Sequence, residues 1–594
     1  MKIIDLEQVI KEGLSKAFQE VYQHDLPSEE IALQPTRKDF DGEFTFVTFP
    51  YGRISKASPE DTAKALGEKL VAQMEEIKAF NVVKGFLNLE LSDAVWLKVI
   101  EQISKDEDFG RFPANGKKVL VEYSSPNTNK PLHLGHLRNI LLGFSLSRIL
   151  DANGYDVTRV QIINDRGIHI CKSMLAYQKF GEGETPESSG IKGDHLIGKY
   201  YVRFDQEQKK QVAEMVENGA DPKVAAKEAP VVLEAQQMLK DWEAGDLETV
   251  KLWETMNSWG YAGFDETYDK MGVKFDRIYY ESETYLLGKE LVEEGLSNDI
   301  FYKKDDGSAW VDLTDMGLDE KLLLRGDGTS VYITQDMGTA DMRYNDFHFT
   351  KSIYVVGNEQ DYHFDVLFKI LKKMGRPYTE GMYHLSYGMV DLPEGKMKSR
   401  EGTVVDADDL MREMEDTARV HTEELGKIEG FSEEEAHELY QTIGLGALKY
   451  FILKVDPRKR ILFNPRESVD FQGNTGPFIQ YTHARISAIL RRASELEMEN
   501  KMPENLHAAE LAVIRMLYDF PSKVSMAGEE YSPSVIGQYV YELAKEYNRF
   551  YAELSIFNAE DKSSMAFRVE LSAQVARVIR LGMNMLGIEV PERM

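Results

Sequence analysis

Residues 125–138 have the sequence Ser-Pro-Asn-Thr-Asn-Lys-Pro-Leu-His-Leu-Gly-His-Leu-Arg and lie between a strand-like apolar run, 119–123, and a helical pattern, 137–150. A helix that begins here directs free backbone N–H groups and the positive end of its dipole toward a ligand. Gly135, between His133 and His136, lets that ligand approach the backbone closely. The whole stretch predicts a nucleotide phosphate site, whereas a bare His-x-Gly-His would equally well be a helix start with two surface histidines.

The segments that follow predict an α/β fold. A second strand-like run, 157–163, completes a strand–helix–strand unit, whose two strands should be parallel. Further strand-like segments at 330–334 and 353–356, the latter followed by a helix at 364–374, extend this unit to a doubly wound, Rossmann-like sheet with its ligand site at the carboxyl ends of the strands.

The chain should divide into several domains, because 594 residues exceed what one hydrophobic core supports. Residues 1–115 mix helix and strand, and we expect an N-terminal α+β domain. The Rossmann-like domain should cover 116–395, with a charge-rich helical insertion at about 166–272, and a connecting region should cover 396–454. Long amphipathic patterns near Pro477, Ala508, Ser532 and Ser564 predict an all-α bundle over 455–594.

Composition limits the class of protein. The single cysteine, Cys171, excludes an intramolecular disulfide and a cysteine-based zinc site, so we expect no zinc and no resident metal. No signal peptide or membrane span is apparent, and a soluble cytoplasmic protein is expected. The net charge of −29 argues against nucleic acid as a partner. Basic clusters at 454–460 and 485–492 provide local positive charge that nucleic acid could contact, or they are simply solvated helix faces.

A second loop carries phosphate-binding side chains. Residues 395–403 have the sequence Gly-Lys-Met-Lys-Ser-Arg-Glu-Gly-Thr, with glycines near both ends and cations between them. Such a loop can close on phosphates, although a solvated basic turn is the simpler interpretation of this segment alone.

Together, the two loops resemble the "HIGH" and "KMSKS" signatures of class I aminoacyl-tRNA synthetases, and their flanks resemble the arginyl enzymes. The resemblance implies a HUP-type catalytic core that uses ATP with Mg²⁺. It implies that His133, Gly135, His136 and Lys396 bind ATP, and that the catalytic cations and histidines are Lys130, His133, His136, Lys396, Lys398 and Arg400. Ser399 stands where the family usually has its second lysine; by resemblance Lys130 compensates for it, and Lys398 and Arg400 are the alternatives for contacting the pyrophosphate.

Four further segments resemble the arginine-binding contacts of that family. A guanidinium requires planar, paired acceptors, which carboxylates supply. By resemblance, the substrate residues are Asn127, Glu281, Tyr332, Asp336 and Gln360. Taken singly, each acid would be a surface charge or a helix cap.

Residues 473–485 and 586–594 resemble the family's anticodon-binding domain, and the N-terminal unit resembles its tRNA-elbow domain. The implied tRNA contacts are Phe86, Asn88, Tyr547 and Met594. Tyr547 and Tyr551 are four residues apart on a predicted helix, so they could also pack in a core.

The favoured interpretation is a monomeric arginine–tRNA ligase whose partners are L-arginine, ATP and tRNA(Arg), with no membrane partner, and whose activation step requires bound tRNA. One alternative is a tRNA-binding protein that has kept the fold and lost the activity, for which Ser399 is the only evidence. Another is a nucleotidyltransferase acting on a small molecule, which gives the helical C-terminal domain no role. Cysteinyl and glutamyl synthetases share the core but fit less well.

Overall fold

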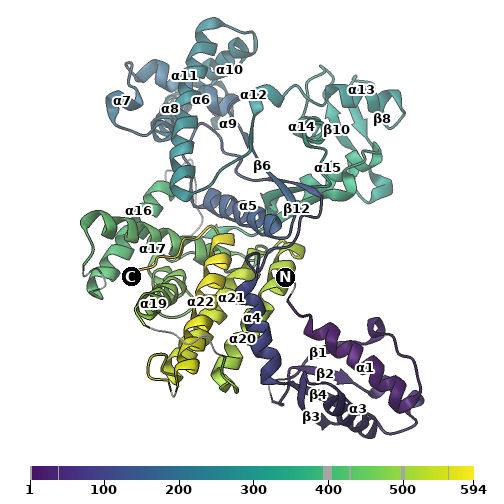
Figure 1. Ribbon diagram of the computed structural model, residues 1–594. Coiled ribbons are helices and arrows are strands. Elements are labelled where there is room, and N and C mark those ends of the chain that lie inside the picture. The colour runs from purple at the N-terminus through teal and green to yellow at the C-terminus, as the bar shows by residue number, and fades with distance from the viewer. Residues whose placement is uncertain are drawn as a thin grey trace.

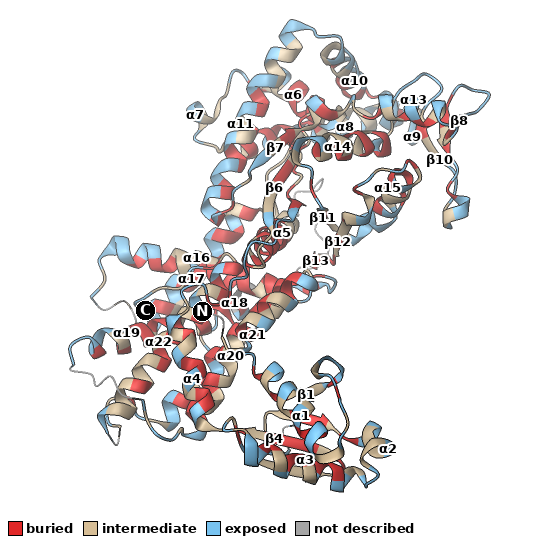
Figure 2. Cartoon of the chain, turned by 45° about the vertical axis from the view of Figure 1, so that its right-hand side comes forward, coloured by how far each residue is buried: buried red, intermediate tan, exposed pale blue. Residues whose placement is uncertain are grey.

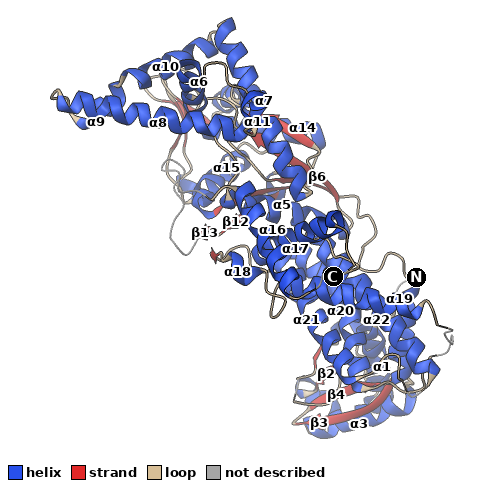
Figure 3. Cartoon of the chain, turned by 90° about the vertical axis from the view of Figure 1, so that its left-hand side faces the viewer, coloured by secondary structure: helices blue, strands red, loops and turns tan. Residues whose placement is uncertain are grey.

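The computed structural model describes residues 3–37, 39–391, 405–426, 428, 430–496, 502–559 and 561–594. The molecule is elongated (Figure 1, Figure 3). The N-terminal unit lies at one end, the helical bundle lies in the middle, and the parallel sheet with its inserted helices forms the other end. Among the helices of the described residues, none is both long enough and apolar enough to cross a membrane.

The catalytic core is built on a five-stranded parallel sheet with the order β12-β11-β5-β6-β7. The chain leaves the central strand β5 toward β6 and β7, and then returns to the other side of β5 as β11 and β12. This is the predicted doubly wound sheet. Its strands are β5 (Lys118–Glu122), β6 (Asp156–Ile163), β7 (Arg277–Tyr280), β11 (Lys351–Gly357) and β12 (Met382–Tyr387).

Helix α5 (Leu134–Ala152) follows the histidine motif and connects β5 to β6. The helix is apolar on nearly all sides, as expected for a helix that is buried on every face. It packs on the sheet and also against helices of the bundle, and Figure 2 shows it mostly buried. The predicted strand–helix–strand unit, including the parallel pairing of its strands, is therefore confirmed.

The insertion between β6 and β7 is helical, as predicted. Helices α6 and α8 pack together, and α8 also packs along α11. The helices are α6 (Ile168–Phe180), α7 (Pro186–Ser189), α8 (Gly193–Glu217), α9 (Pro222–Glu228), α10 (Pro230–Glu243) and α11 (Leu247–Met271).

The second half of the core departs from the prediction at 330–334. Only Ser330 makes a bridge, with Leu324, and helix α14 (Tyr332–Phe347) begins two residues later. A short apolar run does not distinguish a strand from the first turn of a buried helix. This half also holds a small antiparallel sheet that was not predicted. The sheet has the order β10-β9-β8, with β8 (Phe301–Lys303), β9 (Ala309–Val311) and β10 (Lys321–Leu324). The other elements of this half are α12 (Glu281–Thr284), α13 (Lys289–Ser297) and α15 (Asp361–Lys373).

The N-terminal unit is the expected α+β domain, with an antiparallel sheet of order β1-β2-β4-β3. Helix α4 (Asp93–Lys105), which follows it, packs against α20 and α22 of the bundle (Figure 1). The other elements are α1 (Leu6–Tyr22), β1 (Leu33–Pro35), β2 (Phe44–Val47), α2 (Gly52–Ser55), α3 (Pro59–Gln73), β3 (Ile77–Val83) and β4 (Phe86–Leu91).

The C-terminal part is the predicted helical bundle, and its helices begin where caps are expected. Thr475 caps α19 with its side chain, and Pro533 occupies the first turn of α21. Two earlier helices, α16 and α17, join the bundle through packing of α17 on α19. The elements are β13 (Val390–Asp391), α16 (Ala407–Glu424), α17 (Glu433–Leu453), β14 (Ile461–Leu462), α18 (Pro465–Ser468), α19 (Gly476–Ala493), α20 (Ala508–Glu529), α21 (Pro533–Glu553) and α22 (Lys562–Met585).

Candidate active site

His133 and His136 form a capping box at the start of α5. Nδ1 of His133 accepts a hydrogen bond from the Gly135 N–H at 3.2 Å, and Nδ1 of His136 accepts one from the His133 N–H at 3.1 Å. The ring centroids are 3.8 Å apart. Because both Nδ1 atoms accept, the hydrogen of each neutral ring is on Nε2, and each ring can donate through that atom to an anion.

Burial keeps both imidazoles neutral. It lowers the pKa of His133 to about 4, with added repulsion from the Lys130 ammonium. Burial, followed by repulsion from His133 and Lys130, also lowers the pKa of His136 well below its ordinary value. The pair is therefore suited to stabilise negative charge on phosphate oxygens through directed N–H groups rather than through net positive charge.

The His133 ring lies close to Gly135 and leaves little room for a side chain there. A Cβ atom on residue 135 would lie 3.0 Å from Cε1 and 3.1 Å from Nδ1 of His133. We expect Gly135→Ala to displace that ring and raise the KM for ATP about tenfold, a loss of about 1.4 kcal/mol in the complex with ATP. Helix stability should not fall, since alanine favours a helix over glycine. ATP–pyrophosphate exchange at varied ATP measures the effect, and an unchanged KM would contradict this account of Gly135.

The histidine motif lies beside the point where the strand order reverses. Asn139 on α5 connects β5 and β11, the strands on either side of this point. Its Oδ1 accepts a hydrogen bond of 2.6 Å from the N–H of Ser124, just after β5, and its Nδ2 donates one of 2.6 Å to the carbonyl of Val355 in β11. In open α/β sheets, ligands bind in the crevice outside the carboxyl ends of the strands at this switch point. The geometry therefore agrees with the predicted position of the nucleotide site.

Three carboxylates form one acidic cluster, in which Asp165 and Asp336 lie close enough to Glu281 for their charges to act on it. Glu281 directly follows β7, Asp165 follows β6, and Asp336 is on α14. Burial raises the pKa of Glu281 to about 7; attraction to Arg166 opposes this shift, and the charges of Asp165 and Asp336 add to it. The separation of these acids in sequence did not show that they interact, but the fold does.

Asp165 was missed by the sequence analysis. Its carboxylate is buried and accepts hydrogen bonds from the Ser282 N–H at 2.8 Å, the Ser282 hydroxyl at 2.7 Å and the Tyr261 hydroxyl at 2.8 Å. These contacts fix the backbone next to Glu281. An acid just beyond the end of a parallel strand was the available signal, because strand ends in such sheets line the ligand crevice.

The remaining predicted arginine contacts also lie near strand ends or on α14. Asn127 forms a parallel bridge with Asn164, next to Asp165. Gln360 ends the short turn after β11 and is exposed. Tyr332 begins α14 and is 78% exposed. One turn further on, Asp336 contacts Nε2 of His363 at 2.6 Å.

The three cations predicted in the second loop, Lys396, Lys398 and Arg400, lie outside the described residues. The segment that precedes the loop is held by Arg138 of α5, whose guanidinium is fully buried. Arg138 donates to the carbonyls of Met389 at 3.3 Å and Lys459 at 2.7 Å, among others. The helix that begins with the histidines therefore also fixes the backbone beside β13.

Two predicted tRNA contacts are core residues, which contradicts a direct contact with RNA. Tyr547 has no exposed surface and donates its hydroxyl to Ser572 Oγ at 2.9 Å. Asn88 is buried on β4 and donates to Asn81 Oδ1 at 2.7 Å. In both cases the side chain faces the interior because the neighbouring helices or strands cover it. Phe86 is half-buried and packs edge-on against another ring.

Met594, the fourth predicted contact, lines a cavity of about 690 Å³ on the bundle. Cations and aromatic rings alternate around it: Arg485 lies over the Tyr551 ring at 5.3 Å, and Arg492 lies over the Phe557 ring at 4.3 Å. Tyr551, one turn after Tyr547, is 41% exposed. The cavity therefore presents an exposed aromatic ring one turn after the predicted contact Tyr547.

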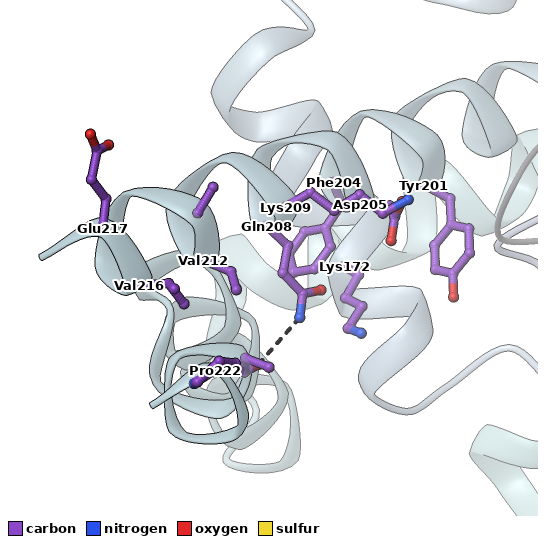
Figure 4. A pocket seen from close by; sticks show the side chains of 12 residues that line it. Lys172, Tyr201, Phe204, Asp205, Gln208, Lys209, Val212, Val216, Glu217 and Pro222 are labelled. Carbon is purple, nitrogen blue, oxygen red and sulfur yellow. Dashed lines mark hydrogen bonds and ion pairs between the residues drawn. The ribbon is translucent and has the colours of Figure 1, made fainter. Parts of the chain in front are cut away.

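A second cavity, of about 760 Å³, lies within the insertion (Figure 4). Helices α6, α8 and α9 line it with apolar side chains such as Phe204 and Val212, and with Lys172 and Asp205 of opposite charge. Gln208 crosses to the Ala226 carbonyl at 3.3 Å. The lining of this cavity includes neither the histidine pair nor the three carboxylates.

Comparison with known proteins assigns the fold and the bundle to one family. Residues 98–464 match the family model described as tRNA synthetases class I (R), catalytic domain, and residues 479–594 match the DALR anticodon binding domain. The chain belongs to the class I arginyl-tRNA synthetases. This assignment removes the small-molecule nucleotidyltransferase from consideration.

Relatives of the synthetase match it over its whole length. The arginine–tRNA ligase of Amoebophilus asiaticus is 57% identical, with 100% of both chains covered, and that of Bacteroides fragilis is 56% identical, with 99% of this chain and 100% of the relative covered. Among solved structures, the Thermus thermophilus arginyl-tRNA synthetase aligns with a TM-score of 0.78 at 25% identity, with 99% of this chain and 100% of that chain covered. The predicted family and fold class are confirmed.

Proposed function

We propose that this synthetase is an ATP-dependent arginine–tRNA ligase, which forms arginyl-adenylate and transfers arginine to the 3′ end of tRNA(Arg). One observation carries the proposal: two members of the acidic cluster, Asp165 and Glu281, and the pair of neutral histidines all follow carboxyl ends of the parallel strands, and Asp336 completes the cluster. The Nδ1 atoms of both histidines accept hydrogen bonds, which leaves their Nε2–H groups to donate. Arginine is a cation with a planar fork of donors, and carboxylates are its matching acceptors.

In the first step, a carboxylate oxygen of arginine attacks the α-phosphorus of ATP, which enters as its Mg²⁺ complex, and the bond to pyrophosphate breaks. Glu281 and Asp336 hold the guanidinium, while Asn127, Tyr332 and Gln360 orient the rest of the amino acid. Nε2–H groups of His133 and His136 donate to the phosphate oxygens as charge develops. Lys130, with Lys396, Lys398 and Arg400, neutralises the leaving pyrophosphate. The chain contributes positioning and electrostatic stabilisation, without a covalent enzyme intermediate.

In the second step, the 2′-hydroxyl of the terminal adenosine of tRNA attacks the carbonyl carbon of the adenylate, and AMP leaves. We expect bound tRNA to be required for the first step as well. ATP–pyrophosphate exchange with each of the twenty amino acids, with and without unfractionated tRNA, tests both points. Exchange with arginine alone, rising when tRNA is added, is the expected result. Exchange with another amino acid would overturn the pocket assignment, and silence with retained tRNA binding would favour a tRNA-binding protein without activity.

The cavity beside Met594 supports an anticodon contact through Tyr551, in place of Tyr547. Stacking of one base on an exposed aromatic ring is worth about 1–3 kcal/mol. We expect Tyr551→Ala to raise the KM for tRNA about 10- to 100-fold at fixed salt and to leave tRNA-independent nucleotide binding unchanged. Tyr541→Ala, on the same helix, is the control, since Tyr541 packs against Phe478 and does not line the cavity. Equal effects of the two substitutions would contradict the contact.

We further propose that the enzyme works as a monomer in the cytoplasm. The acidic cluster, the histidine pair and the cationic, aromatic cavity all belong to one chain, which supports a site that needs no second copy. Sedimentation equilibrium at the concentrations used for the exchange assay measures the mass in solution, and a dimer there would contradict the proposed monomer.

A further inference from the structure

The start of helix α8, in the insertion, contacts a segment, residues 406–408, that is paired through its backbone with the histidine motif. Lys192 Nζ lies 2.7 Å from Asp408 Oδ2, and His195 Nε2 lies 3.0 Å from the same oxygen and 3.3 Å from Asp406 Oδ2. Thr267 of α11 also donates to Asp408 Oδ1 at 3.1 Å. Residues far apart in the sequence therefore converge on the first turn of α16.

That first turn is paired through its backbone with the histidine motif. The Leu134 N–H donates to the Val405 carbonyl at 3.1 Å, and the Ala407 N–H donates to the Leu132 carbonyl at 2.9 Å. His133 and Asp406 form the antiparallel bridge between these two bonds. A displacement of residues 405–407 would therefore move the backbone that carries His133.

Helix α8 also lies against Pro131, in the loop that leads into His133. Gly198, three residues after His195 and on the same helix face, approaches so closely that a Cβ atom there would lie 2.9 Å from Pro131 Cδ. At Gly260 of α11, a Cβ atom would lie 3.5 Å from Thr128 Cβ, which is ordinary van der Waals contact. One helix thus supports both the ion-pair contact at Asp408 and the loop that leads into His133.

The cluster is an ion-pair network rather than a vacant cation site. Asp194, His195 and Asp408 lie close enough together to hold a metal. However, the Lys192 ammonium already lies 2.7 Å from Asp408 and 3.3 Å from Asp194, and provides the positive charge that these carboxylates need. Burial favours the neutral form of Asp408, but hydrogen bonds from His195 and Lys192 more than offset it and lower the pKa of that carboxyl. The hydrogen bond to Asp408 is the main cause that raises the pKa of His195.

We propose that Lys192 and His195 are positioning residues for adenylate formation: they hold Asp406 and Asp408 so that the paired backbone presents His133 to the nucleotide, and they couple the inserted helices to that step. Neither residue belongs to the acidic cluster or to the histidine pair described above. The inference rests on the proposed function of His133 and His136.

The test compares Lys192→Met and Lys192→Arg in ATP–pyrophosphate exchange, with the exposed Lys210→Met on the same helix as control. A misplacement of about 1 Å costs about 100-fold in rate, so we expect Lys192→Met to lower kcat about 10- to 100-fold. The KM for arginine should stay within about twofold, because Glu281 and Asp336 are not disturbed. Lys192→Arg, which keeps the charge, should recover most of the rate. A Lys192→Met enzyme that matches Lys210→Met would overturn the proposal.

A second variant guards against simple loss of folding. Gly198→Ala should strengthen α8 as an isolated helix, because alanine favours a helix over glycine, while its Cβ pushes against Pro131. For Gly198→Ala we expect a lowered kcat and an unfolding temperature that does not fall. A purely structural role predicts instead that kcat and the unfolding temperature fall together, and that result would contradict the proposal. His133→Ala separates the two hypotheses. If exchange survives His133→Ala, the assignment of the nucleotide site is wrong. If exchange is lost in His133→Ala while Lys192→Met and Gly198→Ala are fully active, only the positioning role is refuted.

Discussion

Replacing both His133 and His136 with alanine should abolish adenylate formation. Each ring presents one Nε2–H, and removal of a single donor that stabilises developing charge typically costs about 10²–10³ in rate. Because the two residues act as a unit, the double change should cost about 10⁴-fold or more, although the single losses need not multiply. Single-turnover formation of arginyl-adenylate measures the step directly.

The same variant should bind tRNA nearly as tightly as the parent enzyme, since the cationic, aromatic cavity at Met594 is on the bundle. The matched control is His363→Ala, which removes a histidine from Asp336 and not from the nucleotide site. That control should change the KM for arginine more than the rate at saturating arginine. Adenylate formation that survives loss of both His133 and His136 would refute the nucleotide-site assignment.

Glu281→Gln should weaken arginine binding more than any other single substitution in the acidic cluster. Truncating one partner of a buried, hydrogen-bonded charge pair costs about 2–5 kcal/mol, which is about 30- to 5000-fold in Kd. The amide keeps the size of the side chain and removes its charge, so folding should be preserved. Isothermal calorimetry with arginine gives the Kd, and citrulline, which lacks the charge, provides the matched ligand control. A Glu281→Gln enzyme that binds arginine normally would contradict the pocket assignment.

Arginine binding to the parent enzyme should also depend on pH near neutrality. Burial raises the pKa of Glu281 to about 7 in the empty pocket, so that below pH 7 the carboxyl is mostly protonated and must lose its proton to pair with the guanidinium. The guanidinium stays charged throughout. Affinity should therefore rise with pH, by about tenfold between pH 6 and 8, because only the ionised fraction is competent. Glu281→Gln should remove this dependence, and an opposite slope would show that another group controls binding.

Much of the fold could be predicted from local patterns. The strands β5 and β6, helix α5 and the four long helices of the bundle were all expected near their observed positions, because each carries its own periodicity or cap. The prediction of a strand at 330–334 was wrong because a short apolar run is compatible both with a strand and with the start of a helix. The small sheet β8–β10 was missed because strands of three or four residues give almost no periodic signal.

By itself, the sequence determined where the chemically able residues stand: the histidine pair at a helix start, the carboxylates of the kind that a guanidinium requires, and two tyrosines four residues apart on one helix. The histidine pair and the tyrosines follow from residue type and local spacing, whereas Glu281 and Asp336 were selected among many acids by resemblance to the family. The tertiary structure decided which of these residues meet. Strand order brought Asp165 beside Glu281, and helix packing buried Tyr547 while leaving Tyr551 exposed one turn later. Packing also determined protonation, because an imidazole or a carboxyl changes its pKa only when the rest of the chain removes water around it.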